Sequence, residues 1–143
     1  MYKIIGLFLL ATSLQGCSFL VDLAFFNNTD TPVEVCNLNL TTPKCQTVQA
    51  KSLEKITLVA DKQVFAWTYS ISQGSKKGVY EFEFGQYPEH ASEVYCHGLF
   101  MRVCDIPVQY EKNGMLYWGG KNNELPVQVY PEQPEGFPVK PSA

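Results

Sequence analysis

The chain has 143 residues and a formal net charge of −3, with 17% of its residues charged and 13% aromatic. This length predicts a single domain, and the aromatic content is typical of a folded β-rich domain rather than a disordered tail. The mildly acidic balance argues against a nucleic-acid-binding protein and against a basic surface that attaches to membranes.

The first residues have the composition of an export leader. Lys3 provides a positive charge, and a mostly apolar run follows over residues 4–14. That run is shorter than the roughly 20 apolar residues that cross a bilayer, and it has the length of a signal peptide. It ends in Leu14-Gln15-Gly16-Cys17, which resembles the lipobox of bacterial lipoproteins. Gln15 departs from the small or β-branched residue that this family usually has there.

The resemblance implies that residues 1–16 are a signal peptide and that Cys17 becomes an acylated N-terminus. Several acyl chains anchor a protein stably where one does not, so the domain would stay on its membrane. By the same resemblance, Ser18 after the cysteine favours the bacterial outer membrane, with the domain on the periplasmic face or on the cell surface. The alternative is an ordinary signal peptide followed by a chance cysteine.

Four further cysteines predict disulfides. An even set in an oxidising compartment predicts two bridges, and four cysteines allow three connectivities. We predict that each bridge closes a short loop of the kind that a hairpin holds. A metal site is the alternative, with His97 as a further ligand, but zinc ligands favour closer spacing than these cysteines have. The predicted pairs are Cys36–Cys45 and Cys96–Cys104.

Short segments of alternating apolar and polar residues follow the leader, separated by turn residues. Such alternation predicts half-buried antiparallel strands. Phe65, Trp67 and Tyr69 share one face of such a strand, which favours the core; a ligand cleft is the alternative. Asn113-Gly114 predicts a hairpin with a type I′ turn. The strands are expected at residues 23–26, 32–36, 45–50, 53–59, 64–71, 79–84, 94–104, 107–112, 115–118 and 125–130.

This succession of strands predicts the all-β class, as an antiparallel β-sandwich of the immunoglobulin-like class with two local disulfides. The domain is expected to span residues 23–130, after a lipidated cysteine and short linker at residues 17–22. Residues 131–143 contain four prolines, so we expect an extended, partly mobile tail. A partner could use such a tail as a docking peptide.

The sequence contains none of the common catalytic motifs, such as a serine-hydrolase elbow, a P-loop or a zincin motif. His90, Glu93 and His97 would share one face of a helix, but residues 94–104, which include His97, are predicted as a strand, in which that geometry fails. We therefore expect no enzyme, no metal site and no cofactor. A cell-wall enzyme is the weakest of three hypotheses.

Aromatic residues near the Asn113-Gly114 hairpin and the Gly119-Gly120 turn are the candidate partner surface, because Tyr and Trp often anchor interfaces. The alternative is the closing layer of the sandwich. The expected function is a non-enzymatic binding or assembly factor of an envelope complex. The second hypothesis is an immunity or inhibitor lipoprotein that neutralises a toxin, lytic enzyme or phage factor. The candidate surface residues are Tyr110, Tyr117, Trp118 and Tyr130.

Overall fold

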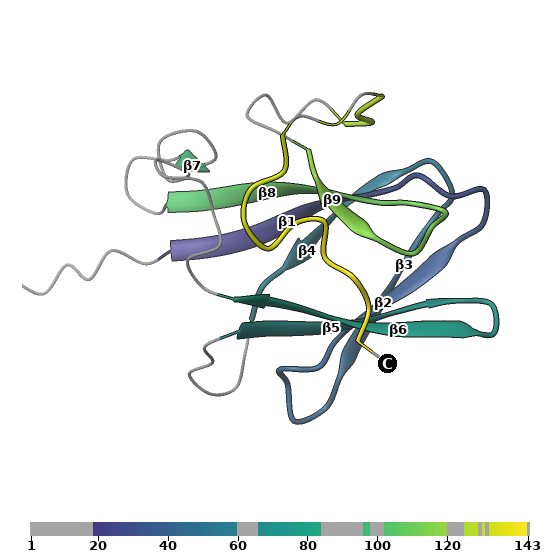
Figure 1. Cartoon of the computed structure of the whole chain (residues 1–143). Coiled ribbons are helices and arrows are strands. Elements are labelled where there is room, and N and C mark those ends of the chain that lie inside the picture. The colour runs from purple at the N-terminus through teal and green to yellow at the C-terminus, as the bar shows by residue number, and fades with distance from the viewer. Residues whose placement is uncertain are drawn as a thin grey trace, which may run out of the picture.

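Figure 1 shows the computed structural model, which describes residues 19–59, 66–83, 96–97, 102–119, 125–128, 130 and 132–142. Only the backbone is described at residues 19–21, 82–83, 96–97 and 102–103. The described residues are all-β, with strands in two sheets. They include no helix with the length and apolar character that a membrane crossing requires.

The first sheet has the order β4-β1-β8-β7, and β9 also pairs with β8. Its strands are β1 (Phe19–Asn27), β4 (Leu53–Thr57), β7 (Cys96–His97), β8 (Arg102–Tyr110) and β9 (Leu116–Trp118). β1 and β8 run parallel, so the prediction of a wholly antiparallel fold is wrong for this pair. A parallel pair needs a long crossover between its strands, and the whole second sheet lies in that connection.

The second sheet has the order β3-β2-β5-β6, and all of its pairs are antiparallel. Its strands are β2 (Val33–Asn37), β3 (Lys44–Val48), β5 (Ala66–Gln73) and β6 (Lys76–Glu83). The strands predicted between residues 23 and 84 are therefore confirmed, with shifted ends.

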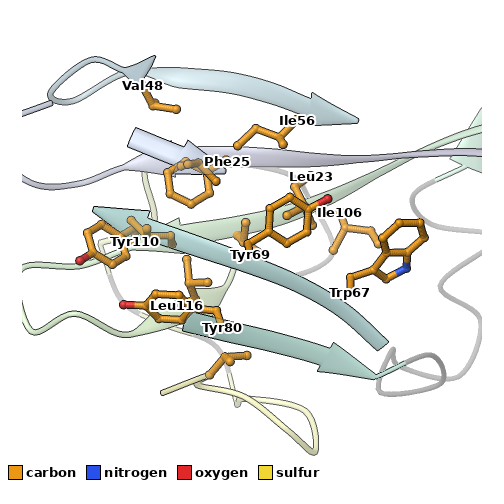
Figure 2. Close-up of a cluster of buried hydrophobic side chains, with 14 of the residues drawn as sticks. Leu23, Phe25, Val48, Ile56, Trp67, Tyr69, Tyr80, Ile106, Tyr110 and Leu116 are labelled. Atoms are coloured by element: carbon orange, nitrogen blue, oxygen red, sulfur yellow. The ribbon is translucent and has the colours of Figure 1, made fainter. Parts of the chain in front are cut away.

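The two sheets share one apolar core (Figure 2). Along the strand residues whose side chains are described, alternate residues point inward, as the alternation in the sequence predicts. Trp67 and Tyr69 are buried in this core, which confirms their predicted role, and Phe65 lies outside the described residues. The core residues include Leu23, Phe25, Val33, Val35, Ile56, Tyr80, Ile106, Val108 and Leu116.

The hairpin between β8 and β9 is correctly predicted, but its turn is not of type I′. The Glu111 N–H donates to the Met115 carbonyl at 3.0 Å, which leaves a three-residue loop. Within it only Gly114 has a positive φ, at 77°. A type I′ turn has two central residues, both with positive φ. The loop here is longer and contains a single left-handed residue, Gly114.

The strand predicted at residues 94–104 is divided, since only Cys96–His97 and the residues from Arg102 onward are strands among those described. The strand predicted at residues 125–130 is wrong, because none of its described residues, 125–128 and 130, is in a strand. Pro126 has no N–H to donate, and the Val127 N–H donates to Gln109 Oε1 at 2.7 Å instead of to a neighbouring strand.

The domain extends beyond the predicted boundaries at both ends. β1 begins at Phe19, inside the expected linker, because β8 pairs with it from that residue onward.

The tail is also docked rather than mobile. Val139 is buried and exchanges two backbone hydrogen bonds with Leu116, and the Ser142 N–H donates to the Val79 carbonyl. The tail thus joins β9 of one sheet to β6 of the other (yellow in Figure 1).

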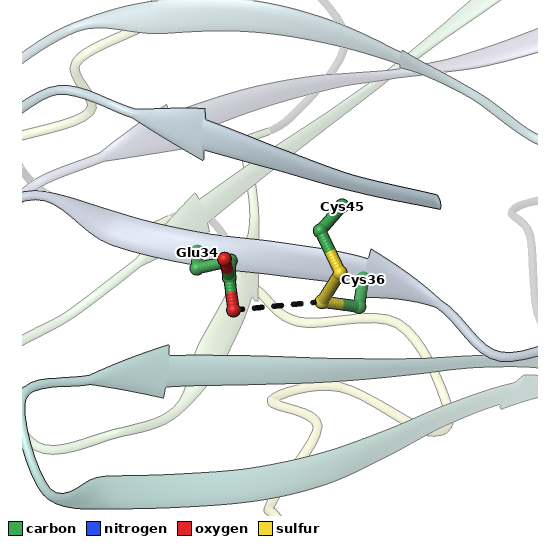
Figure 3. The surroundings of a disulfide bond; sticks show 3 residues. All are labelled: Glu34, Cys36 and Cys45. Carbon is green, nitrogen blue, oxygen red and sulfur yellow. Dashed lines mark hydrogen bonds between the residues drawn. A yellow bond between two sulfur atoms is a disulfide. The ribbon is translucent and has the colours of Figure 1, made fainter. Parts of the chain in front are cut away.

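The predicted disulfide between Cys36 and Cys45 is confirmed, with an S–S distance of 2.06 Å (Figure 3). The two cysteines lie directly opposite each other on β2 and β3. Cys96 and Cys104 have the same relation on β7 and β8, but the Cys96 side chain lies outside the described atoms. The second bridge therefore remains a prediction.

Replacing Cys36 and Cys45 together by alanine is expected to lower the free energy of unfolding by about 2–3 kcal/mol. The bridge closes a short loop and so lowers the conformational entropy of the unfolded chain, and the double variant loses this effect. Urea unfolding of the double variant and the oxidised wild type measures the difference. Equal midpoints of the two proteins would contradict the expectation.

Candidate functional site: a cleft at the ends of β1 and β8

The four predicted surface residues divide into two pairs. Tyr110 and Trp118 are only 5% and 6% exposed, so their assignment to an exposed partner surface is wrong. Tyr110 is the last residue of β8 and still points inward, where its ring packs near Phe25 and Tyr80. Because the hairpin loop is short, both residues stay within paired strands.

Tyr117 and Tyr130 are partly exposed and lie together. Their rings stack with centroids 4.2 Å apart and an interplanar angle of 20°. They line a surface cleft of about 780 Å³, here called the tyrosine cleft. The other lining residues are Asn28, Lys51, Glu111, Lys112, Asn113, Pro126, Val127 and Gln128.

The tyrosine cleft forms where the parallel strands β1 and β8 both end. The Asn28 N–H donates to the Tyr110 carbonyl at 2.9 Å, which continues the pairing by one residue. Beyond this point the β8–β9 loop and the segment around Val127 form the walls. The sheet register therefore brings residues far apart in the sequence to one place.

Glu111 is the centre of the polar network in the cleft. Its Oε1 accepts hydrogen bonds from Asn28 Nδ2 at 2.7 Å, from Gln109 Nε2 at 2.7 Å and from the Tyr130 hydroxyl. Gln109 is fully buried, and its Oε1 accepts a hydrogen bond from the Val127 N–H. One carboxylate thus ties together β1, β8 and the segment that carries Tyr130.

This network shifts the pKa values of its two acidic groups. Partial burial alone would raise the pKa of Glu111, but the hydrogen bonds from Tyr130, Asn28 and Gln109 outweigh it, so the pKa lies below its usual range. Burial raises the pKa of Tyr130, and the adjacent Glu111 carboxylate raises it further. At neutral pH the network therefore consists of a carboxylate and a neutral tyrosine.

The lowered pKa of Glu111 predicts a pH-dependent contribution to stability. The folded state binds the proton more weakly than the unfolded state. The contribution is therefore present above the ordinary Glu pKa of about 4.3, and it is lost as the pH falls through the lowered folded-state pKa. We expect Glu111→Gln to be less stable than the wild type at pH 7. The difference in urea midpoint should shrink on acidification, and a constant difference would contradict this prediction.

Lysines occupy the rim of the cleft. Lys51 has a left-handed backbone, with φ of 56°, and its Nζ donates to the Asn28 carbonyl at 2.8 Å and to Asn28 Oδ1 at 2.9 Å. Lys112 Nζ lies 2.5 Å from Asp30, and this hydrogen bond lowers the pKa of Asp30. The rim is therefore charged, but its lysines already contact protein oxygens.

Tyr117 is also held in place by hydrogen bonding. Asn113 Nδ2 donates to its hydroxyl at 2.9 Å. Together with the stack on Tyr130, this contact fixes the ring at the cleft. Rigid aromatic side chains of this kind make large contacts at a small cost in conformational entropy.

The described residues offer one group with metal-ligand atoms close together, formed by Glu34, Cys36 and Cys45. The sulfurs of Cys36 and Cys45 form a disulfide, so neither can act as a thiolate ligand. Glu34 lies 3.8 Å from Cys36 Sγ, a contact without a donated proton (Figure 3). His90 and Glu93 lie outside the described residues, as does the side chain of His97.

Sequence reasoning found Tyr117 and Tyr130 but missed Asn28, Gln109 and Glu111. Asn28 and Glu111 each follow a strand, and Gln109 is the penultimate residue of β8. Nothing in the local sequence indicates that their side chains meet. Comparison with family models, with curated proteins and with solved structures finds no match to this chain.

Proposed function

We propose that this protein is a lipid-anchored, non-enzymatic binding or assembly factor of a bacterial envelope complex, attached through Cys17 to the periplasmic face of the outer membrane. The resemblance of Leu14-Gln15-Gly16-Cys17 to a lipobox supports the anchor. The tyrosine cleft is proposed as the surface that binds a partner protein.

The direction of β1 is the observation that carries this proposal. β1 begins two residues after Cys17 and has nine residues, which span about 25–30 Å in an extended strand. The tyrosine cleft lies at the far end of this strand, next to Asn28. An anchor at Cys17 would therefore hold the cleft away from the membrane, where a partner can reach it.

The composition of the cleft fits protein recognition better than catalysis. Its aromatic pair is partly exposed, and the lysines around it are typical of the polar rim of an interface. Glu111 Oε1 accepts three hydrogen bonds from protein groups, an arrangement that positions side chains rather than transfers protons.

The experiment is cross-linking of the lipidated, full-length protein in native envelopes, with identification of its partners by mass spectrometry. We expect envelope-complex subunits to be captured by the wild type and lost with Tyr117→Ala, whose melting temperature should stay close to that of the wild type. Lys77→Ala, which changes an exposed residue of β6 that does not line the cleft, is the control. Capture of a toxin or lytic enzyme would support the inhibitor hypothesis instead, and equal capture by Tyr117→Ala would exclude the cleft.

We also propose that the two sheets form an immunoglobulin-like β-sandwich with a second disulfide between Cys96 and Cys104. Their direct opposition on β7 and β8 supports this pairing. Peptide mapping without reduction is expected to recover Cys96 linked to Cys104. Recovery of either cysteine as a free thiol would contradict the pairing.

A further inference from the structure

The Cys36–Cys45 bridge lies on the outer face of the second sheet. Val33 and Val35 of β2 belong to the core, so Glu34 and Cys36 share the opposite face of this strand. Cys45 lies directly opposite Cys36 on β3. The bridge therefore joins two neighbouring strands of one sheet on the side that faces away from the core.

The two cysteines of the bridge differ in exposure. Cys45 is an exposed residue of β3, whereas Cys36 is only 7% exposed. β3 is also an edge strand, since it pairs with β2 alone among the described strands. A small thiol in solution therefore reaches the bridge most easily from the side of Cys45.

A carboxylate stands beside the more buried sulfur. Glu34 Oε2 lies 3.8 Å from Cys36 Sγ, and one Glu34 oxygen and both sulfurs lie within 4.8 Å of one another (Figure 3). Glu34 is exposed, and none of the ion pairs within the described residues involves it. Lys44 precedes Cys45 but points to the opposite face of β3, because consecutive strand residues alternate. The bridge thus has an unpaired negative charge next to it.

Reduction of the bridge places negative charge on its sulfurs. A thiolate attacks one sulfur and forms a new S–S bond with it, while the Cys36–Cys45 bond breaks and the other cysteine leaves as a thiolate. A second thiolate then releases the attached thiol as a disulfide, so two thiols are oxidised and both cysteines are reduced. Attack at Cys45 expels the Cys36 thiolate beside Glu34, and attack at Cys36 brings the incoming thiolate there. The Glu34 carboxylate opposes both routes.

We propose that Glu34 protects the Cys36–Cys45 bridge against thiol–disulfide exchange, most strongly against anionic thiols. Two like unit charges 4 Å apart in water repel each other enough to slow such a reaction roughly fivefold. The protection is kinetic, because both released cysteines are mostly protonated at neutral pH and the carboxylate then no longer faces a charged sulfur. It would preserve the bridge among the thiols and disulfide-exchanging proteins of an oxidising compartment, and it depends on neither the lipid anchor nor the tyrosine cleft.

The test is the rate at which thiols of different charge reduce the bridge in the oxidised full-length protein. Cysteamine is cationic, β-mercaptoethanol is neutral and thioglycolate is anionic, and alkylation with mass spectrometry follows the release of Cys36 and Cys45. Glu34→Gln should raise the rate with β-mercaptoethanol roughly fivefold, more with thioglycolate and less with cysteamine. High salt should reduce these differences, since it screens exposed charges.

Two controls separate the electrostatic effect from other roles of Glu34. Glu54→Gln removes the same charge from an exposed residue of β4, in the other sheet, and should leave all of the rates unchanged. In a buffer of oxidised and reduced dithiothreitol, Glu34→Gln and the wild type should reach the same ratio of bridged to reduced protein. Unchanged rates in Glu34→Gln would overturn the proposal. A shift in this ratio as large as the change in rate would also overturn it, because Glu34 would then stabilise the hairpin itself.

Discussion

Deletion of residues 132–143 is expected to lower the free energy of unfolding by about 3 kcal/mol. The deletion exposes the surface that Val139 and Phe137 cover, and it removes three backbone hydrogen bonds to β9 and β6. It also leaves the two sheets without the segment that joins them on that side. Urea or thermal unfolding of the deleted and intact chains measures the loss.

Two single substitutions separate this packing effect from a general effect of the tail. Val139 is buried, so Val139→Ala should destabilise the domain by about 1–2 kcal/mol. The neighbouring Lys140 is exposed, and Lys140→Ala should change the stability by less than about 0.5 kcal/mol. Equal stability of the deleted and intact chains would mean that the tail is not docked.

Gly78 permits this docking, because a Cβ there would lie 2.7 Å from Pro141 Cβ.

Asn27→Ala is expected to cost about 3 kcal/mol or more of unfolding free energy. The Asn27 side chain is 0% exposed, and its Nδ2 lies 2.9–3.2 Å from the carbonyls of Thr31, Val48 and Gln49. Its Oδ1 accepts from the Thr29 N–H at 3.0 Å. Alanine would remove the three contacts of Nδ2 and would leave the buried Thr29 N–H without its acceptor. An unsatisfied buried donor is more costly than the loss of the hydrogen bond itself.

Asn27→Asp should be more harmful than Asn27→Ala, because it places a carboxylate oxygen against three carbonyls in a buried site. Gln49→Ala is the control. The Gln49 side chain is exposed, so its loss should leave the unfolding midpoint nearly unchanged. An Asn27→Asp variant as stable as the wild type would show that this corner does not hold the ends of β1 and β3 together.

The period of two in the sequence predicts most of the fold, because it records which side of each strand is buried. It places Trp67 and Tyr69 in the core correctly. It fails at residues 125–130, where a buried Gln109 side chain takes the backbone hydrogen bonds that a neighbouring strand would use. A competitor of this kind comes from elsewhere in the sequence, and local alternation cannot reveal it.

The tail was misjudged for a similar reason. Its prolines predict an extended chain correctly, but an extended chain docks wherever apolar residues between the prolines find a sheet edge, as Val139 does.

The candidate site is only half visible in the sequence. Tyr117 and Tyr130 stand out as aromatic residues near turns, whereas Glu111 becomes central only because β1 and β8 end side by side. The error at Tyr110 and Trp118 has one cause, since a short hairpin loop keeps both residues in paired strands.

The most direct test of the proposed anchoring is mass spectrometry of the N-terminal peptide of the protein purified from bacterial envelopes. We predict a peptide that starts at Cys17 and carries a diacylglycerol on the thiol and an acyl chain on the amine. A peptide that retains residues 1–16, or one that begins at an unmodified Cys17, would contradict the lipid anchor and the orientation of the tyrosine cleft that depends on it.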